Sequence, residues 1–193
     1  MTRNSWLRSC FAIIANYYLA CYLGVMSLGD SVMSISPINE NSWDGIVKIQ
    51  EEAYTDIAPE DVKVLKSKWY SSPQTCAVFT DHKGKVLAYL LAHPWASEIP
   101  PKLNEKIPVI NSPILFIHDL ALAIEGRGKN IGKELVQNLI HNAKAKSYVK
   151  ILLVAVQNST GFWAKFGFIN IPSEEICSNY GENSQLMVLE LET

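Results

Sequence analysis

A glycine-rich turn constrains the fold of this chain more than any other feature of its sequence. Residues 125–135 read EGRGKNIGKEL; an almost wholly apolar run, residues 114–124, precedes them, and helical spacing of apolar residues continues to residue 147. Such an apolar run is typical of a strand that is buried on both faces of a sheet. The unpaired N–H groups at the start of a helix bind phosphate, and glycines let the backbone approach it closely. The turn therefore predicts a strand–turn–helix unit that holds a phosphorylated ligand.

The turn is compatible with more than one kind of ligand. It departs from a P-loop, because Arg127 stands where that motif has its first glycine and Glu134 where a Ser or Thr binds magnesium. Gly126, Gly128 and Gly132 come closer to the spacing of a dinucleotide-binding turn. That fold needs a carboxylate at the end of the next strand and more chain than the roughly 60 residues that follow the turn. A nicotinamide-dependent enzyme and a helix cap without any ligand stay open as alternatives.

Strand and helix signals alternate along the rest of the chain. Asn41 or Ser42 is expected to cap the first helix, and Pro59 to precede the second. A long loop with four prolines is expected over residues 96–113, of the kind that often faces a substrate. The order of elements favours one mixed α/β domain. The expected helices are residues 42–53, 60–69, 129–147 and 159–166, and the expected strands are residues 31–38, 75–81, 85–95, 114–124, 150–156, 168–171 and 185–191.

The composition is that of an ordinary soluble globular protein. Of the 193 residues 48% are hydrophobic and 19% charged, and the net charge is -2, so no excess of basic residues favours a nucleic-acid partner. The length suits a single domain. The cysteines form no C-x-x-C pair and have no histidine at zinc-finger spacing, so we expect reduced thiols and no metal site. They are Cys10, Cys21, Cys76 and Cys177.

The first 32 residues differ from the rest of the chain. Arg3 and Arg8 precede an apolar run over residues 11–26, which resembles a signal peptide or a short membrane anchor. The run is short for a span, which needs about 20 apolar residues. Two other interpretations are an extra helix, and an extension that arises because translation begins at Met33. We therefore expect a separate N-terminal extension, residues 1–32, and a folded domain, residues 33–193, without membrane attachment.

Two stretches of the sequence resemble a known family. HDLALAIEGRGKNIGKEL is similar to the acetyl-CoA motif R/Q-x-x-G-x-G/A of the GNAT acetyltransferases; Arg127, Asn130 and Gly132 fall on its defined positions, and Asn tolerates the left-handed backbone of the glycine it replaces. AVQNSTGFWAKFGF, residues 155–168, is similar to a second family segment, N-x-x-A-x-x-[FL]-Y-x-K-x-G-F. The resemblance covers the chain from about residue 33 to its end. The residues that match the second segment are Asn158, Phe162, Lys165, Gly167 and Phe168.

The resemblance implies a fold and a cosubstrate. The fold would be a central mixed sheet of about six to seven strands with about four helices, opened into a V between the strands 114–124 and 150–156. The cosubstrate would be acetyl-CoA, with its pantetheine bonded to the backbone around Leu122 and Ile124 and reached by Asn158. The pyrophosphate would lie on the amides of residues 127–133. The implied cofactor-binding set is Leu122, Ile124, Arg127, Gly128, Lys129, Asn130, Ile131, Gly132, Lys133, Asn158 and Phe162.

Transfer of an acetyl group to an amine needs a base, because an alkylamine is protonated at neutral pH. His118 is the first choice, since an imidazole titrates near neutrality and strand alternation would place it on the same face as Leu122. A histidine satisfied within the core is the alternative. Arylalkylamine N-acetyltransferases look similar here, with a histidine at this position and another two residues earlier, where this chain has Phe116. Asp119 is the second choice, on the opposite face unless the strand bulges.

The leaving thiolate needs a proton, and here the chain departs from the family. Trp163 stands where the family has a tyrosine, and an indole N–H is no acid. Tyr180 is the candidate substitute, with water or a purely structural tyrosine as alternatives. The departure also motivates a second hypothesis, an acyl-CoA-binding sensory or regulatory module that transfers nothing.

The predicted function is therefore N-acetyl transfer from acetyl-CoA to a primary amine by direct attack. A small-molecule acceptor is preferred to a protein terminus, because Trp69, Tyr70 and Trp95 could line an aromatic pocket with His93 and the long loop nearby. Core packing explains the three aromatic residues equally well. Acetyl-CoA is a cytoplasmic metabolite, so a cytoplasmic location is expected. No metal and no nucleic acid are expected, and a homodimer is left open.

Overall fold

The computed structural model describes residues 33–54, 58–172, 180–181 and 183–192. They belong to a compact unit that spans Met33–Thr193. The predictions for residues 1–32 and for Cys177 lie outside the described residues. In the described part of the chain no helix is both long enough and apolar enough to span a membrane, and Cys76 is a free, buried thiol.

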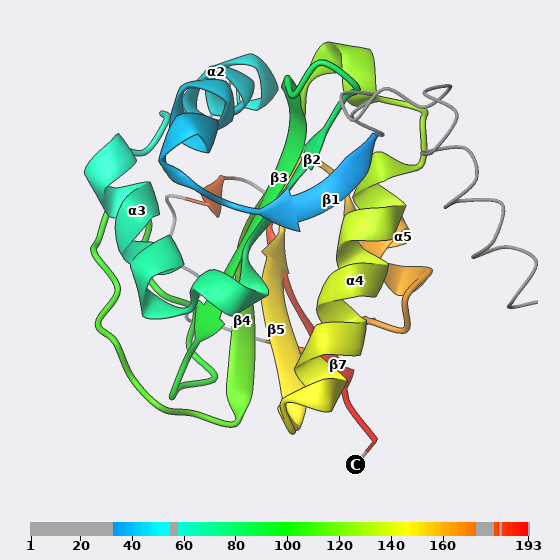
Figure 1. The fold of residues 1–193 in the computed structure, drawn as a ribbon. Coiled ribbons are helices and arrows are strands. Elements are labelled where there is room, and N and C mark those ends of the chain that lie inside the picture. The colour runs from blue at the N-terminus through cyan, green and yellow to red at the C-terminus, as the bar shows by residue number, and fades with distance from the viewer. Residues whose placement is uncertain (1–32, 55–57, 173–179, 182, 193) are drawn as a thin grey trace, which may run out of the picture. The chain divides into compact units, whose positions relative to one another are not determined.

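One mixed sheet of seven strands forms the centre of this unit (Figure 1), counted over the described residues. Its strand order is β1-β2-β3-β4-β5-β7-β6. Neighbouring strands are antiparallel except for β4 and β5, which are parallel. The strands are β1 (Ser34–Pro37), β2 (Ala77–Thr80), β3 (Val86–Pro94), β4 (Ile114–Leu122), β5 (Lys150–Ala155), β6 (Ile169–Asn170) and β7 (Gln185–Glu190).

Four α-helices within the described residues cover the two faces of the sheet (Figure 1). The helices α2 and α3 pack on one face, where their apolar residues join Tyr89 and Leu91 of β3 in one buried cluster. The helix α4 packs on the other face, in a cluster with Leu115 and Ile117 of β4 and Trp163 of α5. The helices are α2 (Trp43–Ala53), α3 (Val62–Ser71), α4 (Ile131–Ala145) and α5 (Thr160–Ala164). The predicted mixed α/β fold is confirmed.

The starts of the first two helices differ slightly from the prediction. A 3-10 helix, Glu40–Ser42, precedes α2, and the side chain of Asn39 accepts a hydrogen bond from the amide of Asn41. Neither Asn41 nor Ser42 therefore caps α2 through its side chain. Asp61 caps α3 by accepting from the amide of Lys63 at 2.7 Å, because a carboxylate satisfies a free N–H of the first turn.

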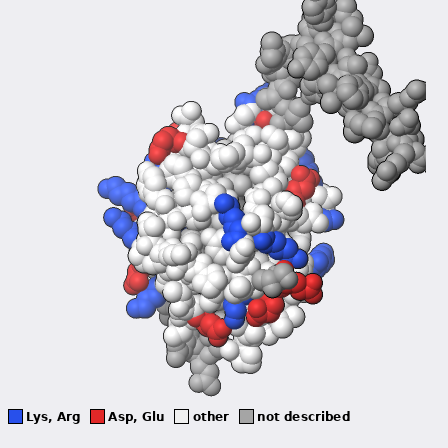
Figure 2. Space-filling view, turned by 60° about the horizontal axis from the view of Figure 1, so that its bottom comes forward, with Lys and Arg blue, Asp and Glu red and all other residues white. Residues whose placement is uncertain are grey.

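The central sheet opens between β4 and β5. The two strands pair only from Ile114 opposite Lys150 to Ile117 opposite Leu153. β4 continues to Leu122 on the side of β3, while β5 continues beside β7. The described unit thus has the split sheet that the sequence implied. Over the face drawn in Figure 2, basic and acidic side chains are interspersed among uncharged ones.

Candidate active site

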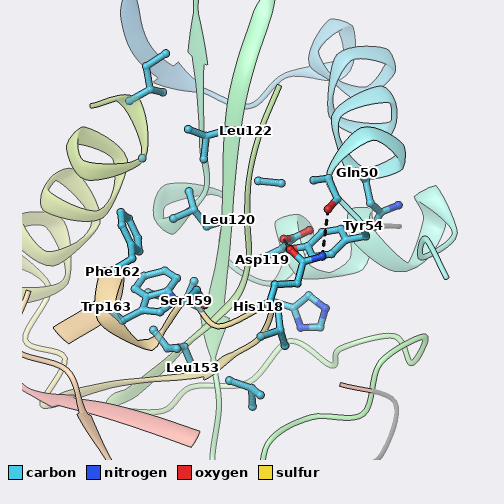
Figure 3. A pocket seen from close by; sticks show the side chains of 18 of the residues that line it. Gln50, Tyr54, His118, Asp119, Leu120, Leu122, Leu153, Ser159, Phe162 and Trp163 are labelled. Carbon is cyan, nitrogen blue, oxygen red and sulfur yellow. Dashed lines mark hydrogen bonds between the residues drawn. The ribbon is translucent and has the colours of Figure 1, made fainter. Parts of the chain in front are cut away.

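A large cavity lies where β4 and β5 part. Its volume is about 890 Å³, and it is lined from the end of α2, from β4, from the first turn of α4 and from α5. Figure 3 shows this arrangement, with Leu120 and Leu122 on the side of Phe162 and Trp163, and with His118, Asp119 and Tyr54 on the other side. The cavity therefore has one wall near the glycine turn and one wall near α2.

A bulge in β4 explains why the two walls differ. Leu91 of β3 pairs with Asp119 and Ala92 pairs with Ile117, so His118 is an extra residue on β4 without a partner on β3. A bulge of this kind interrupts the alternation of side chains. His118 and Asp119 consequently both lie on the side of α2 and α3. The expectation that His118 shares a face with Leu122 was wrong, because it assumed unbroken alternation.

His118 is held by a carboxylate from a distant part of the chain. Its Nε2 lies 2.8 Å from Oε2 of Glu60, which precedes α3. The side chain of His118 is 1% exposed and that of Glu60 8% exposed. Lys68 of α3, which is fully buried, donates to both carboxylate oxygens of Glu60 at 3.0 Å. The three side chains form a buried hydrogen-bonded chain at the wall of the cavity.

Burial and the neighbouring side chains of His118 and Lys68 have opposite effects on the pKa of Glu60. Burial raises the pKa of its carboxyl group, but the hydrogen bond and charge of His118 and the charge of Lys68 outweigh this and lower the pKa to about 2. At Lys68, burial lowers the pKa of the ammonium group and the charge of Glu60 opposes it, with a net lowering. Glu60 therefore stays ionised and needs both partners.

A second histidine lies beside His118. The rings of His93 and His118 have centroids 5.8 Å apart, and Nδ1 of His93 donates to the carbonyl oxygen of Pro94 at 3.0 Å. Burial and the charge of His118 lower the pKa of His93 to about 3, so this ring is neutral. Among the described residues, Nε2 of His93 and Nδ1 of His118 are buried nitrogens without a hydrogen-bond partner.

The carboxylate of Asp119 accepts hydrogen bonds from two tyrosines. Its Oδ1 accepts a hydrogen bond from the hydroxyl of Tyr54, and its Oδ2 accepts one from Tyr89 at 2.5 Å. Burial raises the pKa of Asp119, although both hydrogen bonds act to lower it. Burial and the charge of Asp119 raise the pKa of Tyr54 well above its ordinary value. The arrangement keeps the tyrosine hydroxyls protonated and occupies both oxygens of the carboxylate.

The glycine turn lies at the opposite end of the cavity. Gly126 passes so close to β3 that a Cβ there would meet the carbonyl oxygen of Leu87 at 3.0 Å. Gly128 has φ 75° and Asn130 φ 63°, the left-handed region predicted for the residue that replaces the family glycine. Ile124, Lys129 and Asn158 do not contribute to the lining. The cofactor-binding candidates that do are Leu122, Arg127, Gly128, Asn130, Ile131, Gly132, Lys133 and Phe162.

A pair of substitutions at Asn130 tests the backbone of this turn. Asn130 makes no side-chain capping bond to α4, so its contribution lies in its tolerance of positive φ. Asn130→Ala is expected to lower the free energy of unfolding by about 1 kcal/mol, measured by urea denaturation, because alanine keeps the Cβ that crowds the carbonyl but lacks the short polar side chain that lets Asn adopt this conformation. Asn130→Gly is the matched control and should be at least as stable as the natural chain. Equal stability of the alanine variant would contradict this explanation.

The other predicted residues divide between cavity and core. Tyr180 lines the cavity, is 5% exposed and donates to the carbonyl oxygen of Pro101 at 2.7 Å. Trp163 also lines it and packs edge-on against Phe168, with ring centroids 5.6 Å apart. Four residues considered for an aromatic acceptor pocket, with core packing as the equal alternative, do not line this cavity. They are Trp69, Tyr70, Trp95 and His93.

Two residues of the site were missed by the sequence reasoning. Glu60 reaches His118 and Tyr54 reaches Asp119, across 58 and 65 residues of chain. Neither belongs to a motif, and Glu60 stands in a polar stretch whose charge looks like that of any exposed helix start. Only the order of the strands brings them to the cavity.

The split sheet and the glycine turn meet at the cavity where β4 and β5 part. The family model described as "Acetyltransferase (GNAT) family" matches residues 43–168. The chain belongs to this family, and it is an acetyl-CoA-dependent acyltransferase. This identification sets aside the nicotinamide-dependent and ligand-free interpretations of the turn.

Solved structures share the fold at low sequence identity. Ard1 from Thermoplasma volcanium has a TM-score of 0.66 and 13% identity, over 83% of this chain and 98% of that one. The ribosomal-protein-S18-alanine N-acetyltransferase from Escherichia coli has a TM-score of 0.61 and 13% identity, over 83% and 94%. A NatC complex bound to Gag peptide and CoA has a TM-score of 0.63 and 20% identity, over 83% and 99%. A search of the curated proteins gave no match.

Proposed function

We propose that this protein transfers the acetyl group of acetyl-CoA to the primary amine of a small molecule, by direct attack of the amine with His118 as the base. The observation that carries the proposal is the position of His118 in the cavity wall, at the first residue of β4 beyond its pairing with β5. A base at that point lies between the glycine turn on one side and the space beside α2 on the other.

The residues of the cavity fit acetyl-CoA. Ile131, Gly132 and Lys133 of the first turn of α4 line the cavity, and the free N–H groups and dipole of a helix start would stabilise an anion there. A Cβ at Gly128 would meet nothing within 4 Å, so the turn leaves open space for a bulky phosphate group. The unpaired edge of β4 up to Leu122 offers backbone groups to an extended arm. Acetyl-CoA supplies the acetyl group as a reactive thioester when it is bound.

Different side chains are proposed for the two proton transfers, from the amine and to the departing sulfur. Nδ1 of His118, which is buried and which no described residue pairs, is the proposed acceptor of the proton of the amine, and a water molecule would carry the proton to it. Asp119 is a poorer base, since both of its oxygens already accept tyrosine hydroxyls. Tyr180 is the proposed proton donor for the departing sulfur, supported by its hydroxyl and its place in the lining, whereas Trp163 lacks an acidic proton.

The acceptor is proposed to be compact because the loop after β3 lines the cavity beside the base. Leu103 lines the cavity, and the amide of the next residue, Asn104, is bonded to Glu60. Tyr180 is bonded to the same loop at Pro101. The likeness of the β4 histidine to that of arylalkylamine acetyltransferases is a further reason to test arylalkylamines first. A cytoplasmic location belongs to the same proposal, because the cosubstrate is cytoplasmic.

Two measurements on the full chain test the function. Isothermal titration is expected to show binding of acetyl-CoA and none of NADPH. Release of free thiol is then followed with a panel of alkylamines, arylalkylamines and short peptides that have free N-termini, and turnover is expected with one or more small amines. Turnover with the peptides alone would replace the small acceptor by a protein N-terminus. Binding without turnover on any amine would favour the sensory module and overturn the transferase proposal.

A further inference from the structure

We propose that Glu60 is the positioning residue of His118: it holds the proton of the ring on Nε2, keeps the lone pair of Nδ1 free, and is itself fixed by Gln50, Lys68 and Asn104. This inference rests on the proposed role of His118 as the base. It adds Glu60, which precedes α3, to a site that is otherwise built from the glycine turn and β4.

The hydrogen bonds of Glu60 determine which nitrogen of His118 carries the proton. An ionised carboxylate only accepts, so Nε2 of His118, 2.8 Å from Oε2, must be the donor. In a neutral imidazole the other nitrogen, Nδ1, is then the acceptor. Nδ1 is buried and has no partner in the described part of the chain. The ring is therefore oriented by a carboxylate on one nitrogen and offers its lone pair on the other, as a base must.

Glu60 is held from three directions. The amide of Gln50 in α2 clamps its backbone: Nε2 of Gln50 donates to the carbonyl oxygen at 3.0 Å, and Oε1 accepts from the amide at 3.2 Å. Lys68 of α3 donates to both carboxylate oxygens. The amide of Asn104 donates to Oε1 at 2.5 Å. These hydrogen bonds hold Oε2 of Glu60 in one orientation, toward His118.

The charges that face His118 come from every element packed around it. Glu60 and Lys68 approach from the α3 side, Asp119 follows it on β4, and the neutral ring of His93 lies beside it on β3. The charge of Lys68 balances that of Glu60, and Asp119 is committed to its two tyrosines. Glu60 is thus the group in direct contact with the ring of His118 that sets its orientation.

Glu60→Gln tests the proposal because it replaces one carboxylate oxygen by an NH₂ group. This reverses the direction of the hydrogen bond between residue 60 and His118. Lys68 and the amide of Asn104 are donors, so the side-chain carbonyl oxygen of the new glutamine is drawn to the place of Oε1. Its NH₂ group then faces Nε2 of His118, which must accept, and the ring proton moves to Nδ1. The expected result is a change of tautomer in ¹H–¹⁵N spectra of the ring, from Nε2–H in the natural chain to Nδ1–H. We also expect kcat/KM for the amine to fall roughly 10- to 100-fold, with the Kd of acetyl-CoA unchanged.

A second set of variants separates positioning from folding. Glu60→Gln leaves Lys68 buried without an ionised partner, which destabilises the fold. Glu60→Gln combined with Lys68→Met removes both charges, so it should regain thermal stability without regaining activity. Lys68→Met alone removes one support of Glu60 but leaves its carboxylate on His118, so its activity should lie between that of the natural chain and that of Glu60→Gln. Glu40→Gln, which breaks an exposed ion pair with Lys66, is the matched control and should leave tautomer and activity unchanged.

The outcomes are distinguishable from failure of the proposed function. The same tautomer in the natural chain and in Glu60→Gln would overturn the inference, as would full activity of the double variant. A tautomer change accompanied by full activity would show that His118 is not the base, and would contradict the proposed role of His118 while leaving the positioning by Glu60 supported.

Discussion

His118→Ala is expected to lower kcat/KM for the acceptor amine by about 10²- to 10⁴-fold, the contribution that a positioned general base makes to proton transfer. The loss should appear mainly in kcat, because the ring acts on the proton of the reacting amine. The Kd of acetyl-CoA should change little, since the turn that is proposed to hold its phosphates lies at the other end of the cavity. Steady-state kinetics with detection of free thiol, together with isothermal titration, measure both quantities.

A matched variant controls for the loss of an imidazole. His141 is an exposed residue of α4, so His141→Ala should keep full activity. If His118→Ala retained full activity, the base would have to be another group.

The free energy of unfolding is expected to depend steeply on pH through Glu60. Its pKa is lowered from 4.5 to about 2 in the folded chain, so the folded state favours the ionised carboxylate. A carboxyl group whose pKa is depressed on folding stabilises the protein above its unfolded pKa and loses that contribution as pH falls through its folded pKa. The shift corresponds to a contribution on the order of 3 kcal/mol, present above about pH 5 and lost near pH 2.

Urea denaturation at a series of pH values measures this contribution. The difference in free energy of unfolding between the natural chain and Glu60→Gln should be largest above about pH 5 and shrink toward pH 2. Asp119 acts in the opposite sense, because burial raises its pKa; the charge of Glu60 raises this pKa further, so Asp119 contributes a minor part of the difference. Glu40→Gln should show only a small difference at any pH, as exposed pairs contribute little. A pH-independent difference for Glu60→Gln would refute the ionic origin of its effect.

Local sequence signals were enough to predict the order of strands and helices. The apolar run at residues 114–124 and the helical spacing after it were confirmed as β4 and α4, because burial on both faces sets the pattern of the strand and one buried stripe sets that of the helix. The left-handed backbone at Asn130 was also predicted, since few residues other than Gly and Asn adopt it readily. Element ends were less accurate, and β6 is only two residues long.

The wall of the cavity near α2 could not be predicted in the same way. Its contacts depend on a bulge at His118, for which the neighbouring residues carry no pattern, and on a carboxylate 58 residues earlier in the chain. Once the bulge turns His118 and Asp119 to one side, their partners are decided by where Tyr54, at the end of α2, and Glu60, before α3, lie against this face of the sheet. Such a placement is a property of the whole topology and leaves no local trace in the sequence.

The short pairing of β4 with β5 has a consequence for cooperativity. Four residue pairs join the half-sheet of β1 to β4 to the half-sheet of β5, β6 and β7, fewer than join β3 to β4 on one side or β5 to β7 on the other. A ligand seated in the opening contacts both half-sheets and bridges the seam between them. By mass action it raises the free energy of unfolding by about 2.7 kcal/mol at a concentration 100 times its Kd. Backbone amides on both sides of the seam should then exchange their hydrogens with solvent more slowly, and as a single unit.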